Sequence, residues 1–218
     1  MSNALARKKR ASIGFTKRET EEIREFDAER KRLNDLSRCA YESLVATSFY
    51  ILRIRFGFGK TRLQRFKTDV AVVYQEYRKD QIDMHKFIAQ VDRECKTDAN
   101  DSVNSVPVAH KLYLTGTGSK QITNMQRIVA FKKAYALWYT THLYVLHTIF
   151  KFSNKQISEY LEAVTDMLDT LCRYKQFSVT VPMMIETVRE ETGVEIWRCA
   201  DEQSKQQGTE RSHPEQRH

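Results

Sequence analysis

Two segments of the chain share a pattern of aromatic and aliphatic positions, and this repeat limits the possible folds more than any other feature. Residues 50–66 read YILRIRFGFGKTRLQRF and residues 144–160 read YVLHTIFKFSNKQISEY, an offset of 94 positions (144 − 50). The shared positions have the spacing of one helix face on each side of a turn. They are the pairs Tyr50/Tyr144, Leu52/Leu146, Phe56/Phe150, Phe58/Phe152, Leu63/Ile157 and Phe66/Tyr160. The sequence therefore predicts a duplicated helix–turn–helix unit.

The match extends in both directions from this segment. Further pairs are Ala40/Ala134, Tyr41/Tyr135, Thr47/Thr141 and Val70/Val164 at the offset of 94, and Tyr77/Tyr174, Asp83/Thr180, Ile88/Ile185 and Glu94/Glu191 at an offset of 97. The insertion that changes the offset falls before Asp83, where a loop accommodates it. Aromatic, capping and apolar positions agree over roughly 55 residues, which favours a true duplication. The alternative is that two amphipathic helical hairpins share a pattern without a common origin.

Helix-breaking residues are rare in this chain. Only 7 Gly and 3 Pro occur among 218 residues, and none lies inside the long periodic segments. Hydrophobic residues make up 41% of the chain, which is enough to bury a core. We therefore expect an all-α protein of two tandem three-helix repeats, related by internal duplication and joined by a long irregular linker.

Capping residues set the expected helix boundaries. Capping-box spacing occurs at Thr16/Glu19, Thr123/Gln126 and Ser153/Gln156; Asp83 and Thr180 are expected N-caps, Pro182 suits a first turn, and Gly57 and Gly193 suit helix ends. Residues 96–121 are polar and contain Pro107, so we expect an irregular linker there, with a short extended segment at 110–114.

These boundaries divide the chain into five segments. We expect a disordered basic arm at 1–15, an N-terminal helical repeat at 16–95, the linker at 96–121, a C-terminal helical repeat at 122–199 and a disordered tail at 200–218.

Basic residues concentrate in only one of the two related segments. Residues 51–67 carry six cations and no acidic residue, whereas residues 145–161 hold Lys151 and Lys155 against Glu159. Two of the six lie where a helix should begin, a position at which the helix dipole disfavours cations. A docked polyanion offsets that repulsion, because backbone N–H groups and basic side chains both point at it. We therefore predict a nucleic-acid or acidic-partner surface formed by Arg53, Arg55, Lys60, Arg62, Arg65 and Lys67; the alternative is a solvated face that lacks acids.

Residues 152–161 are similar to the recognition half of a helix-turn-helix DNA reader. This similarity adds Lys155 and Gln156 as candidate nucleic-acid contacts, provided that both side chains are exposed at the groove. The alternative is an ordinary capped helix in a bundle, which has the same sequence pattern.

The spacing of glycines, histidines and cysteines disfavours nucleotide binding, metal binding and catalysis. Residues 57–61 read GFGKT, but a phosphate-binding loop needs a glycine at position 54, where Ile54 stands. The histidines and cysteines show no metal-ligand spacing, and no nucleophile–base set can be assembled. We expect no metal site, no cofactor, no catalytic residues and hence no enzymatic activity.

The location of the protein is inferred from what the sequence lacks. No apolar run reaches the length of about 20 residues that a membrane span needs, and Arg7–Arg10 is not followed by an apolar signal segment. The four cysteines form no C-x-x-C pair, which is typical of free thiols in a reducing compartment. We expect a cytoplasmic protein that does not interact with membranes.

The run FGFGK-x-RL, which follows a Y-x-L-x-x-x-F helix, resembles small uncharacterised helical proteins of phages and prophages of Gram-positive bacteria. The resemblance covers the repeat cores and implies a mobile-element setting inside a host cell. Small basic helical proteins in that setting act as DNA-binding regulators or as inhibitors of host nucleic-acid machinery, including CRISPR effectors.

Composition adds a net charge of +8 and a pI of about 9.3, which favours a polyanionic partner. Our leading interpretation is a non-enzymatic module that binds DNA or RNA, as a phage or mobile-element regulator. The first alternative is a protein-interaction module that inhibits a host nucleic-acid machine through an acidic or nucleic-acid-binding host protein. The second is a structural phage component.

Overall fold

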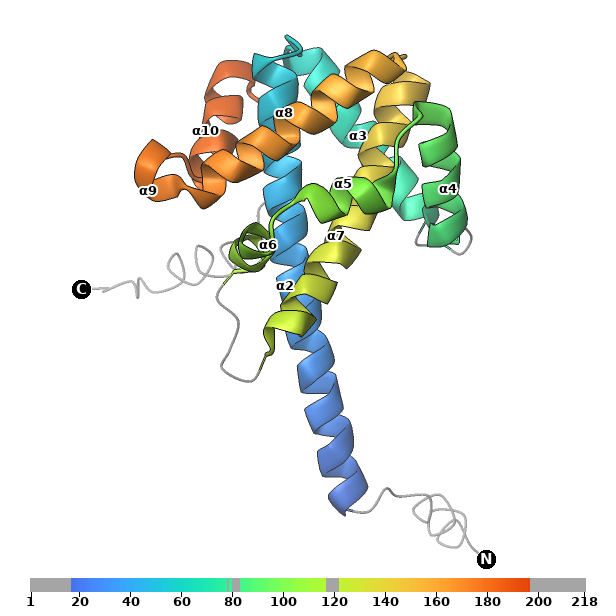
Figure 1. The fold of residues 1–218 in the computed structure, drawn as a ribbon, viewed down its shortest axis with the longest axis vertical. Coiled ribbons are helices and arrows are strands. Elements are labelled where there is room, and N and C mark those ends of the chain that lie inside the picture. Colours follow the sequence, from blue (N-terminus) through green and yellow to red (C-terminus); the bar gives the residue numbers. More distant parts are fainter. Residues whose placement is uncertain (1–16, 78, 80–82, 117–121, 197–218) are drawn as a thin grey trace, which may run out of the picture. The chain divides into compact units, whose positions relative to one another are not determined.

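The computed structural model describes residues 17–77, 79, 83–116 and 122–196, and Figure 1 draws the helices that they form. Every regular element in these ranges is helical, and no strand occurs among them. The expected all-α class is confirmed. The chain divides into two compact units, Met1–Asp35 and Leu36–His218, a boundary that differs from those expected for the two repeats. The expected arm at 1–15 and tail at 200–218 lie outside the described residues.

The described part of the first unit is the beginning of helix α2 (Lys17–Ile54). Side chains described between residues 21 and 32 are all exposed, and Phe26 is 65% exposed. The first buried residue is Leu36, at the start of the second unit. Thr16, the expected N-cap, lies outside the described residues.

The first half of the second unit contains the end of α2, α3 (Lys60–Glu76) and α4 (Met84–Cys95). The expected N-cap of α4 is confirmed, because the Asp83 carboxylate accepts the His85 N–H at 2.9 Å. Lys96 ends α4 in the left-handed conformation, with φ of 55°. Helix α4 packs against α7 (Asn124–Tyr144).

The prediction of an irregular linker at 96–121 was wrong, because this segment contains two short helices, α5 (Ala99–Ser105) and α6 (Val108–Leu114). The expected extended segment at 110–114 is part of α6. Helices this short are marginal alone, so a side-chain cap stabilises α5 and packing stabilises both. The Asp98 carboxylate accepts the N–H groups of Asn100 and Asp101 at 2.8 and 2.9 Å. Helix α5 packs on α7, while α6 packs on α7 and α8.

The second half follows the expected caps closely. After α7 come the π-helical turn η2 (Val145–Ile149), α8 (Asn154–Cys172), α9 (Tyr174–Phe177) and α10 (Val181–Thr192). Both expected capping boxes, at Thr123 and Ser153, are present. Thr180 caps α10 with Pro182 in its first turn, and Gly193 ends it with φ of 67°.

A single core of aromatic and aliphatic side chains joins both halves of the second unit. One group of contacting rings comes from the turn between α2 and α3 and the turn between η2 and α8. Phe56 packs on Phe152 at 5.2 Å between ring centroids, Phe58 on Phe150 at 5.3 Å, and Phe58 on Phe152 at 6.0 Å. The two turns therefore lie side by side and hold each other in place.

None of the described helices combines the length and the apolar character that crossing a bilayer requires.

Candidate nucleic-acid interface

The candidate interface surrounds the turn between α2 and α3, here called the first elbow and defined as residues 55–62. Gly57 has φ of 64°, in the left-handed region that favours glycine. The Phe58 N–H donates to Leu52 O at 2.9 Å, and the Phe58 side chain is fully buried. The buried ring anchors the turn, and the backbone on either side of it faces open space, because a Cβ added at Gly57 or Gly59 would meet nothing within 4 Å.

The start of α3 lacks the features that normally neutralise a helix N-terminus. Gly59 is the N-cap and provides no side-chain hydrogen bond, and the first turn contains no acidic residue. Leu63 N–H makes the first bond back to Gly59 O, at 3.0 Å, so the N–H groups of residues 60–62 have no acceptor within the helix. Lys60 and Arg62 add exposed cations at the same place. The result is a concentration of positive charge and hydrogen-bond donors.

Two of the arginines lie over aromatic rings of the core. The Arg62 guanidinium lies 3.8 Å from the Phe58 ring centroid, and that of Arg65 lies 5.6 Å from the Phe150 centroid. Arg65 also pairs with Asp69 one turn later, at 3.5 Å. Stacking on a ring orients a guanidinium while leaving its N–H edge available for an anion.

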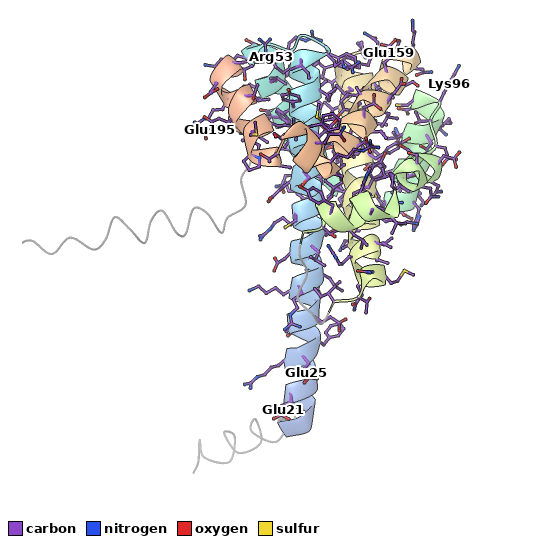
Figure 2. All side chains as sticks on the ribbon, turned by 60° about the vertical axis from the view of Figure 1, so that its left-hand side comes forward. Glu21, Glu25, Arg53, Lys96, Glu159 and Glu195 are labelled. Carbon is purple, nitrogen blue, oxygen red and sulfur yellow. The ribbon has the colours of Figure 1, made fainter. Side chains whose placement is uncertain are left out.

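Three of the four remaining cations lie against the segment that ends α10 and follows it. Arg53 Nε donates to Glu191 Oε2 at 2.7 Å, and Lys67 Nζ donates to Glu195 O at 2.6 Å. The Lys60 ammonium lies 3.6 Å from where a Cβ atom would sit on Gly193. Figure 2 labels Arg53 at the end of α2 and Glu195 in the segment after α10. Residues 51–67, which include no acidic residue, thus contact an acidic side chain 138 positions away from Arg53 in the sequence.

Of the six cations predicted from sequence, three keep an unneutralised charge. Arg55, Lys60 and Arg62 are exposed and have no acidic partner among the residues that the structure describes. Sequence reasoning missed Glu191, for which no local signal exists, and Asp69, which the i, i+4 spacing from Arg65 could have indicated. The candidate site narrows to the first elbow itself.

The second elbow, residues 149–156, joins η2 to α8 and carries the other two predicted residues. Lys155 has an 86% exposed side chain and lies 3.8 Å from Glu159. Gln156 is occupied by the capping box: its Oε1 accepts the Ser153 N–H at 2.9 Å, and its own N–H donates to Ser153 Oγ at 3.3 Å. This helix start is satisfied by its own side chains, so a helix-reading role for Gln156 would require breaking the cap.

No known protein family, curated protein or solved structure matches the chain. Within the described ranges, no three His, Cys, Asp or Glu side chains gather as a possible metal site. The chemistry that the first elbow offers is recognition of an anion by backbone N–H groups, one stacked guanidinium and exposed ammonium and guanidinium groups.

Proposed function

We propose that the chain is a duplicated three-helix unit and that its first elbow binds the phosphates of DNA or RNA. Helix boundaries support the duplication. Helices α4 and α10 each have 12 residues, and their bounds differ by the offset of 97 predicted from sequence (181 − 84 and 192 − 95). Each begins after a side-chain N-cap and ends at a left-handed residue, Lys96 in one and Gly193 in the other.

The two elbows support the duplication independently. Gly57 and Lys151, 94 positions apart, have φ of 64° and 59°. The next residue of each elbow makes the same bond, Phe58 N–H to Leu52 O and Phe152 N–H to Leu146 O, at 2.9 Å in both cases. The ring contacts are also reciprocal, since Phe56–Phe152 and Phe58–Phe150 exchange when the offset is applied. Such reciprocity is what an approximate two-fold axis produces.

The binding proposal rests on one difference between these otherwise similar elbows. The second elbow begins α8 with a complete capping box, whereas the first begins α3 without a side-chain cap and with two cations in its first turn. Cations at a helix N-terminus reduce helix stability by about 0.3–1 kcal/mol each. An elbow that omits its cap and adds repulsive charge is suited to an anion that supplies both missing interactions.

Phosphate is the anion that best fits this arrangement. It accepts several hydrogen bonds at once, and helix N-termini with adjacent Lys and Arg are recurrent phosphate sites. A partner with a polyphosphate backbone also complements the net charge of +8 on the chain. The contacts are to phosphate rather than to bases, so we expect weak dependence on nucleic-acid sequence.

The biological setting is a proposal that follows from the resemblance to phage and prophage proteins alone. In that setting the chain acts without catalysis, as a regulator that occupies nucleic acid in the host cell.

The test is a binding titration with labelled single-stranded and double-stranded DNA and RNA across a range of salt concentrations. Replacing Lys60→Gln and Arg62→Gln together should weaken binding at least about tenfold, because two charge-assisted contacts are lost. The slope of log affinity against log salt should become shallower by roughly 0.9 per lost duplex phosphate contact.

The matched control removes the same two charges from the second elbow, by Lys151→Gln with Lys155→Gln. This variant should keep the wild-type slope, apart from a small uniform loss from the lower net charge. Equal losses in the two double variants, or no nucleic-acid binding by the wild-type protein, would contradict the proposal.

A second candidate is an interaction protein that inhibits a nucleic-acid-processing machine. Exposed apolar side chains on α7 favour it, since Met125 is 69% and Val129 59% exposed one helical turn apart. This candidate predicts a stable complex with a host protein that survives nuclease treatment, whereas the first predicts a complex that nuclease removes.

A further inference from the structure

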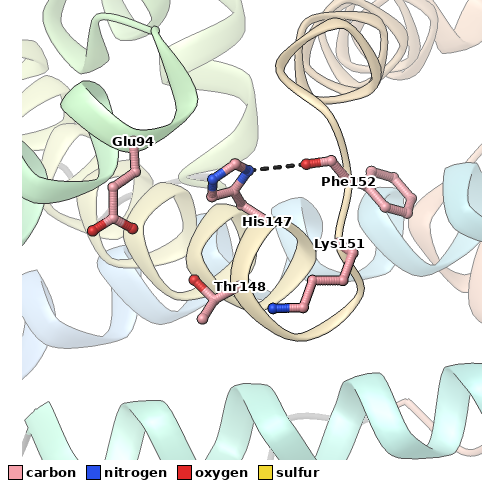
Figure 3. A pocket seen from close by; sticks show the side chains of 5 residues that line it. All are labelled: Glu94, His147, Thr148, Lys151 and Phe152. Carbon is pink, nitrogen blue, oxygen red and sulfur yellow. Dashed lines mark hydrogen bonds between the residues drawn. The ribbon is translucent and has the colours of Figure 1, made fainter.

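A pocket of about 360 Å³ opens beside the second elbow, within the range of about 300–1,000 Å³ that small-molecule sites occupy. It is lined by Glu94 from α4, by His147 and Thr148 from η2, and by Lys151 and Phe152 from the elbow. Figure 3 shows these side chains around the same space. The pocket is separate from the cationic first elbow and plays no part in the proposed nucleic-acid contacts.

A hydrogen bond between two of the lining residues fixes the tautomer of the His147 imidazole. His147 Nδ1 lies 2.9 Å from Phe152 O, and a carbonyl oxygen only accepts, so Nδ1 carries the proton. In the neutral ring the other nitrogen, Nε2, is then an acceptor. Figure 3 shows this second nitrogen on the side of the ring that faces Glu94.

The carboxylate of Glu94 is the only acidic group in the pocket lining. One of its oxygens accepts from Gln90 Nε2 at 3.0 Å. No Lys or Arg of the described chain lies within ion-pair distance of it. Carboxylate, imidazole Nε2 and the Thr148 hydroxyl therefore offer acceptors, which a donor-rich cation satisfies best.

The corresponding position in the first half of the unit already contains such a cation. Applying the offsets of 94 and 97, His147 corresponds to Arg53 and Glu94 to Glu191. Arg53 Nε donates to Glu191 Oε2 at 2.7 Å, so a guanidinium lies directly against this carboxylate. The His147 side chain is shorter than that of arginine, and its Nδ1–H donates to Phe152 O. It therefore cannot replace the guanidinium, and the Glu94 carboxylate has no corresponding cation.

We propose that this pocket binds a guanidinium group, supplied either by free arginine or by an arginine side chain of a partner polypeptide. The planar group has five N–H donors. It pairs with the Glu94 carboxylate and donates to His147 Nε2. The exposed ammonium of Lys151, which also lines the pocket, attracts the carboxylate that free arginine has and that a blocked arginine peptide lacks.

The full chain is titrated with L-arginine, with an arginine tripeptide blocked at both ends, and with L-citrulline, whose ureido group has the shape of guanidinium without its charge. Binding is followed by the ring resonances of His147 and by calorimetry. Saturable shifts with L-arginine or the peptide, at least tenfold weaker with citrulline, support the proposal. Preference for L-arginine identifies a small-molecule site, and preference for the peptide identifies a polypeptide partner.

Three variants decide the role of the residues. Glu94→Gln should weaken arginine binding at least tenfold, whereas Glu159→Gln, an exposed carboxylate on α8, should leave it unchanged. His147→Arg recreates the Arg53–Glu191 pair in the pocket, so it should abolish arginine binding without lowering the melting temperature. None of the three should change nucleic-acid affinity by more than its single charge predicts. Absence of saturable shifts, equal binding of citrulline, or full binding by Glu94→Gln or His147→Arg would overturn the proposal.

Discussion

At the residue scale, the most exceptional side chain is His142 on α7. It is fully buried, and its ring is surrounded by those of Tyr41, Phe66 and Trp138, at 5.3 to 6.4 Å between centroids. Its Nδ1 contacts Thr141 Oγ1 at 3.2 Å, and its Nε2 is buried with no partner among the described residues. Burial lowers the pKa of His142 from 6.5 to about 3, because the charged ring would lose its hydration.

This lowered pKa predicts acid sensitivity. The unfolded chain takes up a proton near pH 6.5 and the folded chain does not, so stability falls as pH drops below about 6.5 and continues to fall toward the folded-state pKa. Between pH 7 and pH 5 the loss from this one group is about 2 kcal/mol of unfolding free energy.

Urea unfolding at the two pH values measures this loss. His142→Phe places an apolar ring among the same aromatic neighbours and should remove about 2 kcal/mol of the difference between pH 7 and pH 5, whatever its effect at pH 7. His85→Gln, at an exposed site, should retain the wild-type difference. An unchanged pH difference in His142→Phe would show that other groups cause the acid sensitivity.

At the scale of single elements, the missing side-chain cap of α3 should link stability to the proposed nucleic-acid binding. Gly59 has ordinary backbone angles, φ −81° and ψ −179°, and open space around its Cβ position, so serine fits there. Gly59→Ser should stabilise the protein by a few tenths of a kcal/mol by capping α3. It should also weaken nucleic-acid binding, because the added hydroxyl competes with phosphate for the same N–H groups.

Thermal unfolding and a binding titration of this variant measure the two effects together. Ser153→Gly, which removes the cap of α8, is the reciprocal control and should lower stability slightly without improving or weakening nucleic-acid binding. Tighter binding by Gly59→Ser would show that the N–H groups of α3 are not part of the interface.

Elements whose ends are coded by a few local residues could be predicted from sequence. Asp83, Thr123, Ser153 and Thr180 cap the expected helices, and Gly193 ends α10. Helices α5 and α6 could not, because their sequences are short and turn-like and their stability comes from packing on α7 and α8. The hydrogen bond of 2.6 Å between Ser102 and Tyr135, for example, joins residues 33 apart.

The candidate site was predictable to a similar extent. The cations themselves and the uncapped start of α3 can be read from residues 51–67. Partners that neutralise some of them cannot, since Glu191 reaches Arg53 only through the tertiary fold. The pocket at Glu94 and His147 also depends on the tertiary fold, because it is lined by residues of both α4 and η2, which no local pattern encodes.

At the scale of the second unit, the two halves have the same turn geometry and different surface chemistry. Each elbow has a left-handed residue, a buried phenylalanine and a helix that begins two residues later. One elbow presents Arg55, Lys60 and Arg62 to solvent, and the other is capped and stands beside a pocket with an acidic lining residue. Under the proposals made above, the two halves supply a shared framework, and the two elbows have acquired different binding properties on it.

The most direct test locates bound nucleic acid on the full chain. Amide resonances of the isotope-labelled protein are recorded while short DNA and RNA oligonucleotides are added at low salt. Our account predicts that the largest shifts occur at the N–H groups of residues 57–62, while those of residues 151–156 stay in place. Shifts centred on the second elbow, or no shifts at residues 57–62 under conditions where binding is measured, would contradict it.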